Sequence, residues 1–250
     1  MIFAIANQKG GVGKTTTAIN LAAALAALEK RVLLVDCDPQ GNATRGLGAT
    51  ASPPNLYAVL AGGALASQAI RPSGFPYLDL LPADRELVGI EVEFSLIENW
   101  QGKLREALAE IAAGYDFVLI DTPPSLGHLT VLALVAAQGV LVPMQCEYFA
   151  LEGVSELVST VRRVAAAWNP RLEIAGIVLT MFDDRMKLTR DVEGEIRRHF
   201  GDLTFRTVVP RNVRLAEAPS HGLSILQYDI KSRGAEAYLG LARELLEGKR

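Results

Sequence analysis

The chain has 250 residues, of which 50% are hydrophobic and 21% are charged, and its formal net charge at pH 7 is −3. This length and composition favour one domain with a large core, spanning residues 1–250, over two small domains. No apolar run approaches the roughly 18 residues that a membrane span needs, and we identify no signal peptide at the N-terminus. The two cysteines, Cys37 and Cys146, do not have the spacing of a zinc site or of a disulfide framework. We therefore expect a soluble cytoplasmic protein.

Charge is distributed unevenly along the chain. Residues 1–184 contain 12 Lys or Arg and 19 Asp or Glu, a balance of −7, whereas residues 185–233 contain 10 and 6, a balance of +4. The net charge by itself argues against nucleic-acid binding, but this distribution allows a local basic surface even on an acidic protein. Chance variation of surface charge explains the same numbers, so composition leaves both interpretations open.

Apolar runs rich in Leu or β-branched residues alternate with helical patterns. The predicted strands are Ile2–Ala6, Arg31–Asp36, Leu78–Leu81, Phe117–Asp121, Val140–Pro143, Ile174–Thr180 and Thr204–Val209. The predicted helices lie near 15–28, 98–112, 126–137, 150–167, 186–200 and 234–247. This alternation predicts an α/β fold, with a mostly parallel twisted sheet between two layers of helices. The segment 45–76 is rich in Gly, Ala and Pro, and we expect it to be irregular with one short helix.

A glycine-rich loop separates the first predicted strand from the first predicted helix. Glycines let backbone N–H groups turn inward around phosphate oxygens, and a helix N-terminus adds partial positive charge. We expect Lys14 to reach the β- and γ-phosphates, the Thr15 hydroxyl to ligate Mg²⁺ and Thr16 to donate to the α-phosphate. Gln8 stands where the usual pattern has glycine, and the alternative is a turn that merely links strand to helix. The candidate nucleotide-binding residues here are Gly10, Gly11, Val12, Gly13, Lys14, Thr15 and Thr16.

Carboxylates follow two further predicted strands. Asp36 and Asp38 flank Cys37, so their side chains point the same way in an extended chain. Strand-end carboxylates near a phosphate loop hold Mg²⁺ through water or orient an attacking water. For Asp38, which precedes Pro39, a turn-capping role is the alternative and is compatible with catalysis. Asp121 ends the apolar run of "FVLID", and we expect it to bind Mg²⁺ through water.

The segment "KGGVGKTT" resembles the deviant Walker A motif of the ParA/MinD family of P-loop ATPases. The resemblance continues through "DPQGNAT", "PPSLG", "CEYFALEG" and "PRNVRLAEAPSHG" and covers nearly the whole chain. It implies ATP and Mg²⁺ as cofactors and a nucleotide-dependent homodimer, in which Lys9 reaches across to the nucleotide phosphates of the partner subunit. It also implies that Asp38 activates the attacking water, with Asp36 supporting the metal shell, and that Pro210 and Asn212 contact the adenine.

Within this family the chain is similar to the ParA/Soj branch, which implies non-specific binding of double-stranded DNA. The positions that match its DNA-binding arginines are Arg185 and Arg214. Lys187 and Arg190 lie on the predicted helix that Arg185 precedes, on a face other than its apolar one. The alternative is an ordinary solvated helix face. The resemblance further implies association with the nucleoid and a ParB-type centromere-binding protein that stimulates a weak intrinsic hydrolysis.

Two other functions share the phosphate loop. A MinD-like regulator would bind membranes through an additional basic amphipathic helix, and we expect no membrane binding because only Gly248, Lys249 and Arg250 follow the last predicted helix. A redox protein like the nitrogenase iron protein would bridge a metal cluster between subunits through two cysteines per chain. The positions of Cys37 and Cys146, near predicted strand ends, argue against that interpretation.

Overall fold

A computed structural model describes residues 1–147 and 150–248. Within these residues, eight strands form one sheet in the order β3-β4-β2-β5-β1-β6-β7-β8. Neighbouring strands are parallel except β3 and β4, which are antiparallel. The strands are β1 (Ile2–Ile5), β2 (Val32–Asp36), β3 (Arg71–Pro72), β4 (Leu78–Leu81), β5 (Phe117–Asp121), β6 (Gly139–Gln145), β7 (Glu173–Phe182) and β8 (Thr204–Pro210). The predicted mostly parallel sheet is confirmed, and the short edge strand β3 is an addition to it.

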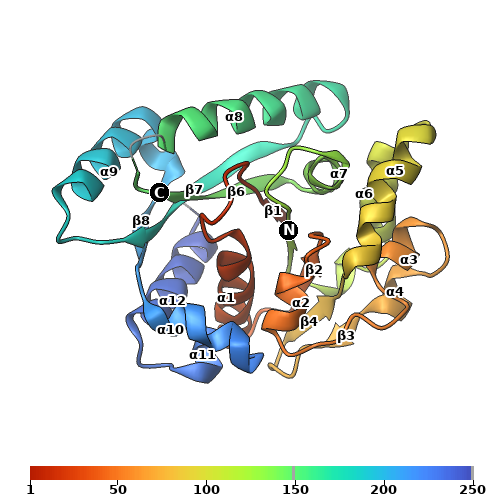
Figure 1. Ribbon diagram of the computed structural model, residues 1–250, viewed down its shortest axis with the longest axis horizontal. Helices are drawn as coiled ribbons and strands as arrows, with labels where there is room; N and C mark the ends of the chain where they lie inside the picture. Colours follow the sequence, from red (N-terminus) through yellow and green to blue (C-terminus); the bar gives the residue numbers. More distant parts are fainter. Residues whose placement is uncertain (148–149, 249–250) are drawn as a thin grey trace.

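Helices cover both faces of the sheet. Figure 1 shows α1 and α12 on one face and α7, α8 and α9 on the other. The helices are α1 (Lys14–Ala27), α2 (Asn42–Gly46), α3 (Leu56–Leu60), α4 (Ala66–Ala69), α5 (Val88–Glu93), α6 (Lys103–Ala109), α7 (His128–Ala136), α8 (Ala150–Ala167), α9 (Lys187–Phe200), α10 (Val213–Glu217), α11 (Ile225–Tyr228) and α12 (Arg233–Leu246).

The strands are apolar on both sides because each side of the sheet has its own core. Phe3 and Ile5 of β1 pack in the core beneath α1 and α12, whereas the alternate residues Ala4 and Ala6 pack in the core beneath α7 and α8. Successive side chains of a strand point to opposite faces of the sheet. When both faces are buried, apolar residues are needed at every position, and apolar and polar residues do not alternate. This explains why the sequence shows continuous apolar runs.

Several short elements depart from the sequence predictions. The segment 45–76 contains two short helices, α3 and α4, where we expected one, and α6 covers only part of the predicted helix near 98–112. Helices of four to seven residues are shorter than the window in which a helical period becomes visible. The apolar stripe of α9 is formed by Val192 and Ile196, with Leu188 exposed in the first turn.

The sheet order brings the carboxyl ends of β2, β5 and β1 together near its centre. β5 lies between β2 and β1, and its last residue, Asp121, is in register with both Asp36 and Ile5. The glycine-rich loop leaves β1 at this same edge. Residues that are far apart in the sequence therefore meet where parallel sheets bind their ligands.

Candidate nucleotide site

The loop between β1 and α1 has the backbone geometry of an anion cradle. Gly11 and Gly13 have φ values of 76° and 85°, in the left-handed region that favours glycine. Gly13 precedes α1, and the helix has neither a side-chain cap nor an acidic residue in its first turn. The N–H groups at the start of α1 therefore remain available to a negatively charged ligand, and the helix dipole favours one.

The two lysines of the loop differ in where their ammonium groups lie. Lys14 is 6% exposed, and its Nζ donates to the backbone oxygen of Lys9 at 3.1 Å. Burial lowers the pKa of Lys14, and the charges of Asp121 and Asp38 oppose that shift. The Lys9 side chain is 41% exposed, and its Nζ pairs with Glu147 at the end of β6. Lys14 thus belongs to its own cradle, whereas Lys9 lies on the surface beside it.

Asp36 is fully buried and is held by the chain itself. One carboxylate oxygen accepts hydrogen bonds from the backbone N–H and the hydroxyl of Thr44, at 2.8 and 2.7 Å, and the other accepts from the Asp38 N–H at 3.3 Å. Burial raises the pKa of Asp36 to about 6, although the Thr44 hydrogen bonds oppose the shift. We did not identify Thr44 from the sequence, and its place in "DPQGNAT", eight residues after Asp36, is the signal that could have found it.

Asp121 is also fully buried but lacks such partners. Neither of its carboxylate oxygens accepts a hydrogen bond of good geometry from the described residues. Burial raises the pKa of Asp121 well above its usual range, Asp36 adds to the effect, and the nearby Thr15 hydroxyl opposes it. Buried polar groups are normally paired, so an orphaned carboxylate indicates a missing ligand.

These residues fit a magnesium ion. Mg²⁺ prefers oxygen ligands and keeps several of its waters, usually using one or two protein groups together with substrate phosphates. Thr15 and Asp121 are the residues that would hold it, because the oxygens of Asp36 are already engaged by Thr44 and Asp38. Across residues 1–147 and 150–248, no group of three or more His, Cys, Asp and Glu is arranged to hold a metal without a nucleotide.

Asp38 lies at the entrance of the site and caps a turn. Its Oδ1 accepts the Gln40 N–H at 2.9 Å, and its backbone oxygen accepts the Gly41 N–H at 2.8 Å. The side chain is 6% exposed, and its charge acts on Lys14. The turn-capping interpretation is therefore correct for the geometry, and it leaves the carboxylate next to the phosphate cradle.

A cavity of about 350 Å³ lies between the start of α1 and the segment that follows β8. It is lined by both predicted adenine contacts, Pro210 and Asn212, and by Thr180, Met181 and Tyr238, which we did not predict. The Thr180 hydroxyl donates to the Val12 backbone oxygen, tying the cavity wall to the loop. Cavities lined mainly by apolar groups with a few placed polar ones are typical ligand sites. The additional residues come from β7 and α12, and no local pattern distinguishes them from ordinary core residues.

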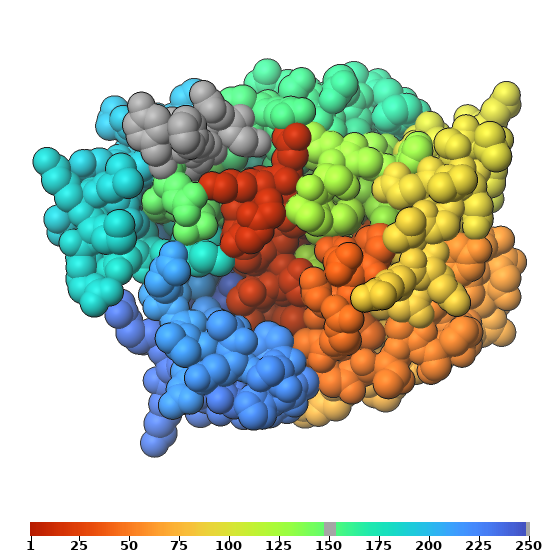
Figure 2. Space-filling model, in the orientation of Figure 1, coloured from red at the N-terminus to blue at the C-terminus, as the bar shows by residue number. Residues whose placement is uncertain are grey.

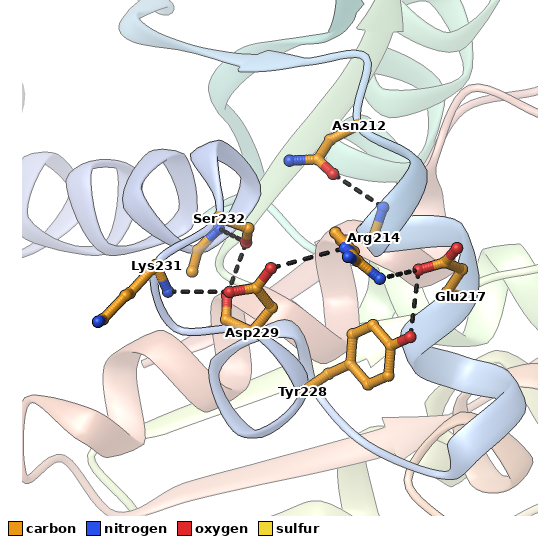
Figure 3. Close-up of polar contacts among 8 residues, drawn as sticks. Asn212, Arg214, Glu217, Tyr228, Asp229, Lys231 and Ser232 are labelled. Carbon is orange, nitrogen blue, oxygen red and sulfur yellow. Dashed lines mark hydrogen bonds and ion pairs between the residues drawn. The ribbon is translucent and has the colours of Figure 1, made fainter.

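The predicted DNA-binding residues differ in their surroundings. Arg185 forms a two-bond ion pair with Asp183, and this pair lowers the pKa of Asp183 to about 2. Figure 3 shows Arg214 between Glu217 and Asp229, with nitrogen–oxygen distances of 2.9 and 3.7 Å. Lys187 and Arg190 are exposed on α9 and form no ion pair with any described residue.

The two cysteines and the helices bear on the two alternative functions, a cluster-bridging redox protein and a membrane-binding regulator. Cys37 and Cys146 are both buried, and the Cys37 thiol donates to the Leu129 backbone oxygen. Thiols buried in this way do not reach a surface where they could bridge a cluster to another subunit. In the part of the chain that the structure describes, none of the helices combines the length and the apolar character needed to cross a membrane.

Comparison with known proteins gives consistent matches. Residues 1–174 match a family model described as an AAA domain. The chain is 53% identical over 253 residues to the chromosome partitioning protein ParA of Caulobacter vibrioides, covering 100% of this chain and 95% of the relative. It is 55% identical over 243 residues to the chromosome-partitioning ATPase Soj of Thermus thermophilus, covering 97% and 94%.

A solved structure shares the fold and contains ligands. It is cobyrinic acid a,c-diamide synthase from Mycobacterium smegmatis with bound ADP and magnesium, which matches with a TM-score of 0.86 and 37% identity over 98% of this chain and 94% of that one. The same protein has been solved with an ATP analogue and magnesium. The phosphate cradle and the orphaned carboxylate of this chain thus occur in a fold that binds adenine nucleotides with magnesium.

Proposed function

The chain belongs to the ParA/Soj family of chromosome-partitioning ATPases, with ATP and Mg²⁺ as its ligands, and we propose that it is a DNA-partitioning switch whose ATP-bound form is a homodimer. The observation that carries the proposal is the different placement of the two loop lysines. Lys14 is buried in its own cradle, while the Lys9 ammonium lies outside it on an exposed ion pair. Because the Lys9 ammonium does not lie in the phosphate cradle of its own subunit, it can contact the phosphates bound in the cradle of another.

In the proposed dimer, two subunits meet through the face that carries the phosphate loop. Figure 2 shows the N-terminal residues, in red, in the middle of this face. Lys9 leaves Glu147 and contacts the phosphates of the nucleotide bound to the partner subunit. A cation supplied from the second subunit acts like an arginine finger, so the site is complete only in the dimer.

Hydrolysis in this site is an in-line attack of water on the γ-phosphorus, in which the bond to the β–γ bridging oxygen breaks and ADP leaves. Asp38 orients the water and accepts its hydrogen bond, and Lys14 neutralises charge on the β- and γ-phosphates. Thr15 and Asp121 would hold Mg²⁺, which would supply further neutralisation of phosphate charge. Catalysis therefore consists mainly of positioning and electrostatics. So small a set of groups gives a weak intrinsic rate that a partner can raise.

The dimer binds double-stranded DNA without sequence preference through Arg185, Lys187, Arg190 and Arg214. Each subunit contributes one set, and dimerisation doubles the number of phosphate contacts. Binding through phosphates releases the counterions of DNA, so it weakens as salt rises. DNA phosphates must also compete with Asp183 for Arg185. A ParB-type centromere-binding protein stimulates hydrolysis and releases the DNA. In this proposal the protein acts in the cytoplasm, on the nucleoid, and residues 1–250 form one ATPase domain.

The test is co-sedimentation with DNA in the presence of ATP, ADP or no nucleotide, together with size-exclusion chromatography. We expect DNA binding and a dimer only with ATP, and Lys9→Ala should lose both while retaining ATP binding. Lys103→Ala, at an exposed lysine of α6, is the matched control and should behave like the unsubstituted chain. A Lys9→Ala protein that dimerises normally would refute the crossing lysine. Binding to anionic liposomes in place of DNA would favour a MinD-like regulator.

A further inference from the structure

The segment of α5 and the turn after it is apolar on two sides. Leu87, Ile90 and Phe94 are buried beneath it, as expected of a surface helix. On the opposite side, the side chains that we call the α5 ridge are exposed: Val88 (54%), Val92 (66%), Leu96 (85%) and Ile97 (43%). Contiguous exposed apolar side chains mark interaction sites, so the exposed side indicates a covering partner.

The surroundings of the ridge restrict what can cover it. Residues 84–98 carry five carboxylates and one arginine, a balance of −4: Asp84, Arg85, Glu86, Glu91, Glu93 and Glu98. A second copy of the same patch would be repelled in an isologous contact, and the phosphates of DNA and of anionic lipid would be repelled as well. An apolar stripe with an acidic rim is complementary to an amphipathic helix with a cationic rim.

Glu91 connects this segment to the nucleotide site. Its Oε2 accepts the backbone N–H of His128 at 3.1 Å and pairs with the His128 Nδ1 at 2.8 Å, and its Oε1 accepts the Leu129 N–H at 3.4 Å. Gly127 is so close that a Cβ there would lie 2.8 Å from the Glu91 carboxylate. These residues begin α7, at the end of the loop that follows Asp121.

The contact continues from the other side of the His128 ring. The Trp100 ring lies edge-on to it, with the ring centroids 4.5 Å apart. Trp100 also packs against Phe94, directly beneath the ridge. Two sets of contacts, one polar and one aromatic, therefore join α5 and the turn after it to the start of α7.

We propose that the α5 ridge is the docking surface for a cationic amphipathic helix of the hydrolysis-stimulating partner, and that Glu91 transmits docking to the loop after Asp121. This inference rests on the proposed function, which supplies the partner. It adds where the partner binds, what chemistry recognises it, and which contact links the docking surface to the carboxylate at the magnesium site.

The test compares ATP hydrolysis as a function of the concentration of the purified ParB-type protein from the same organism, with DNA present. Val92→Asp and Leu96→Asp each place a charge on the ridge, and we expect each to raise the half-maximal partner concentration at least about tenfold, equivalent to about 1.4 kcal/mol, with unchanged basal hydrolysis. Leu65→Asp is the control, because Leu65 is 55% exposed and lies away from the ridge, at the N-cap of α4. It should leave the partner dependence unchanged.

Glu91→Gln tests the transmission separately. It preserves side-chain volume but places an amide N–H₂ against the N–H groups of α7, so we expect partner affinity within about twofold and a several-fold lower maximal stimulation. A purely structural role would instead lower the melting temperature and the basal rate together. Unchanged maximal stimulation would exclude Glu91 as the connecting residue.

Three other outcomes would overturn the inference, each in a different way. Identical partner dependence of Val92→Asp, Leu96→Asp and the unsubstituted chain would show that docking occurs elsewhere. Loss of the ATP-dependent dimer in the ridge variants would assign the ridge to the subunit interface and overturn the inference. If the unsubstituted chain is not stimulated at all, the proposed function falls and the inference falls with it.

Discussion

The burial of Asp36 makes a prediction that combines stability with function. In the unfolded chain this carboxyl has a pKa near 3.8, and in the folded chain it is about 6. The folded state therefore binds more protons than the unfolded state between these values, so the free energy of unfolding falls as pH rises through this window. At 1.36 kcal/mol per pH unit, the ionised Asp36 costs about 3 kcal/mol of stability above pH 6.

The substitution Asp36→Asn removes this cost and little else. Both strong hydrogen bonds, from the Thr44 N–H and hydroxyl, go to the same carboxylate oxygen, which an amide oxygen can replace. The longer contact from the Asp38 N–H, at 3.3 Å, is lost, at a cost of about 1 kcal/mol. We expect the variant to be about 2 kcal/mol more stable at pH 7.5, with the difference falling below about 1 kcal/mol at pH 5.

The measurement is urea denaturation of the ligand-free protein at both pH values, with chelator present to remove divalent ions. The same variant should hydrolyse ATP more slowly, since the site has lost a negative charge beside Asp121. A variant that is less stable than the unsubstituted chain at pH 7.5, or a stability difference that does not change with pH, would refute this account of Asp36.

Four further substitutions address the nucleotide site and the proposed DNA-binding surface. Lys14→Ala should reduce ATP affinity by at least about a hundredfold in calorimetric titration, because it removes the buried ammonium from the cradle, and retained affinity would contradict that role. Asp38→Ala should trap an ATP-bound dimer on size exclusion, whereas normal hydrolysis would exclude Asp38 as the water-orienting group. Arg185→Glu and Arg214→Glu should each weaken DNA binding without affecting dimerisation. Arg214→Glu should also lower the melting temperature, because it removes the ion-pair partner of Glu217 and Asp229. A DNA affinity that does not change with either substitution or with salt would exclude this surface.

Much of the fold could be predicted because its signals are local. Strands buried on both faces appear as continuous apolar runs, and the boundaries of β4 and β5 agree with the sequence prediction. The two-residue strand β3 and helices such as α4 could not be predicted in this way. Their conformations depend on what they pack against, and too few residues are involved to show a period.

The nucleotide site also contains features that the sequence predicts and features that depend on the folded chain. The phosphate loop and the strand-end carboxylates could be predicted from the sequence, because a glycine turn, a helix start and an acid after an apolar run are features of neighbouring residues. The folded chain was needed to show that Lys14 is buried while Lys9 lies outside the cradle and that Thr44 satisfies Asp36. It was also needed to show that, among the described residues, neither oxygen of Asp121 accepts a hydrogen bond of good geometry.

The same holds for contacts between distant segments. Tyr238 meets Thr17 across 221 positions of the chain beside the predicted base pocket, and Glu91 meets His128 at the start of α7. Burial, charge coupling and hydrogen-bond satisfaction depend on which segments the sheet order brings together. These quantities decide the chemistry of a side chain, and they exist only once the chain has folded.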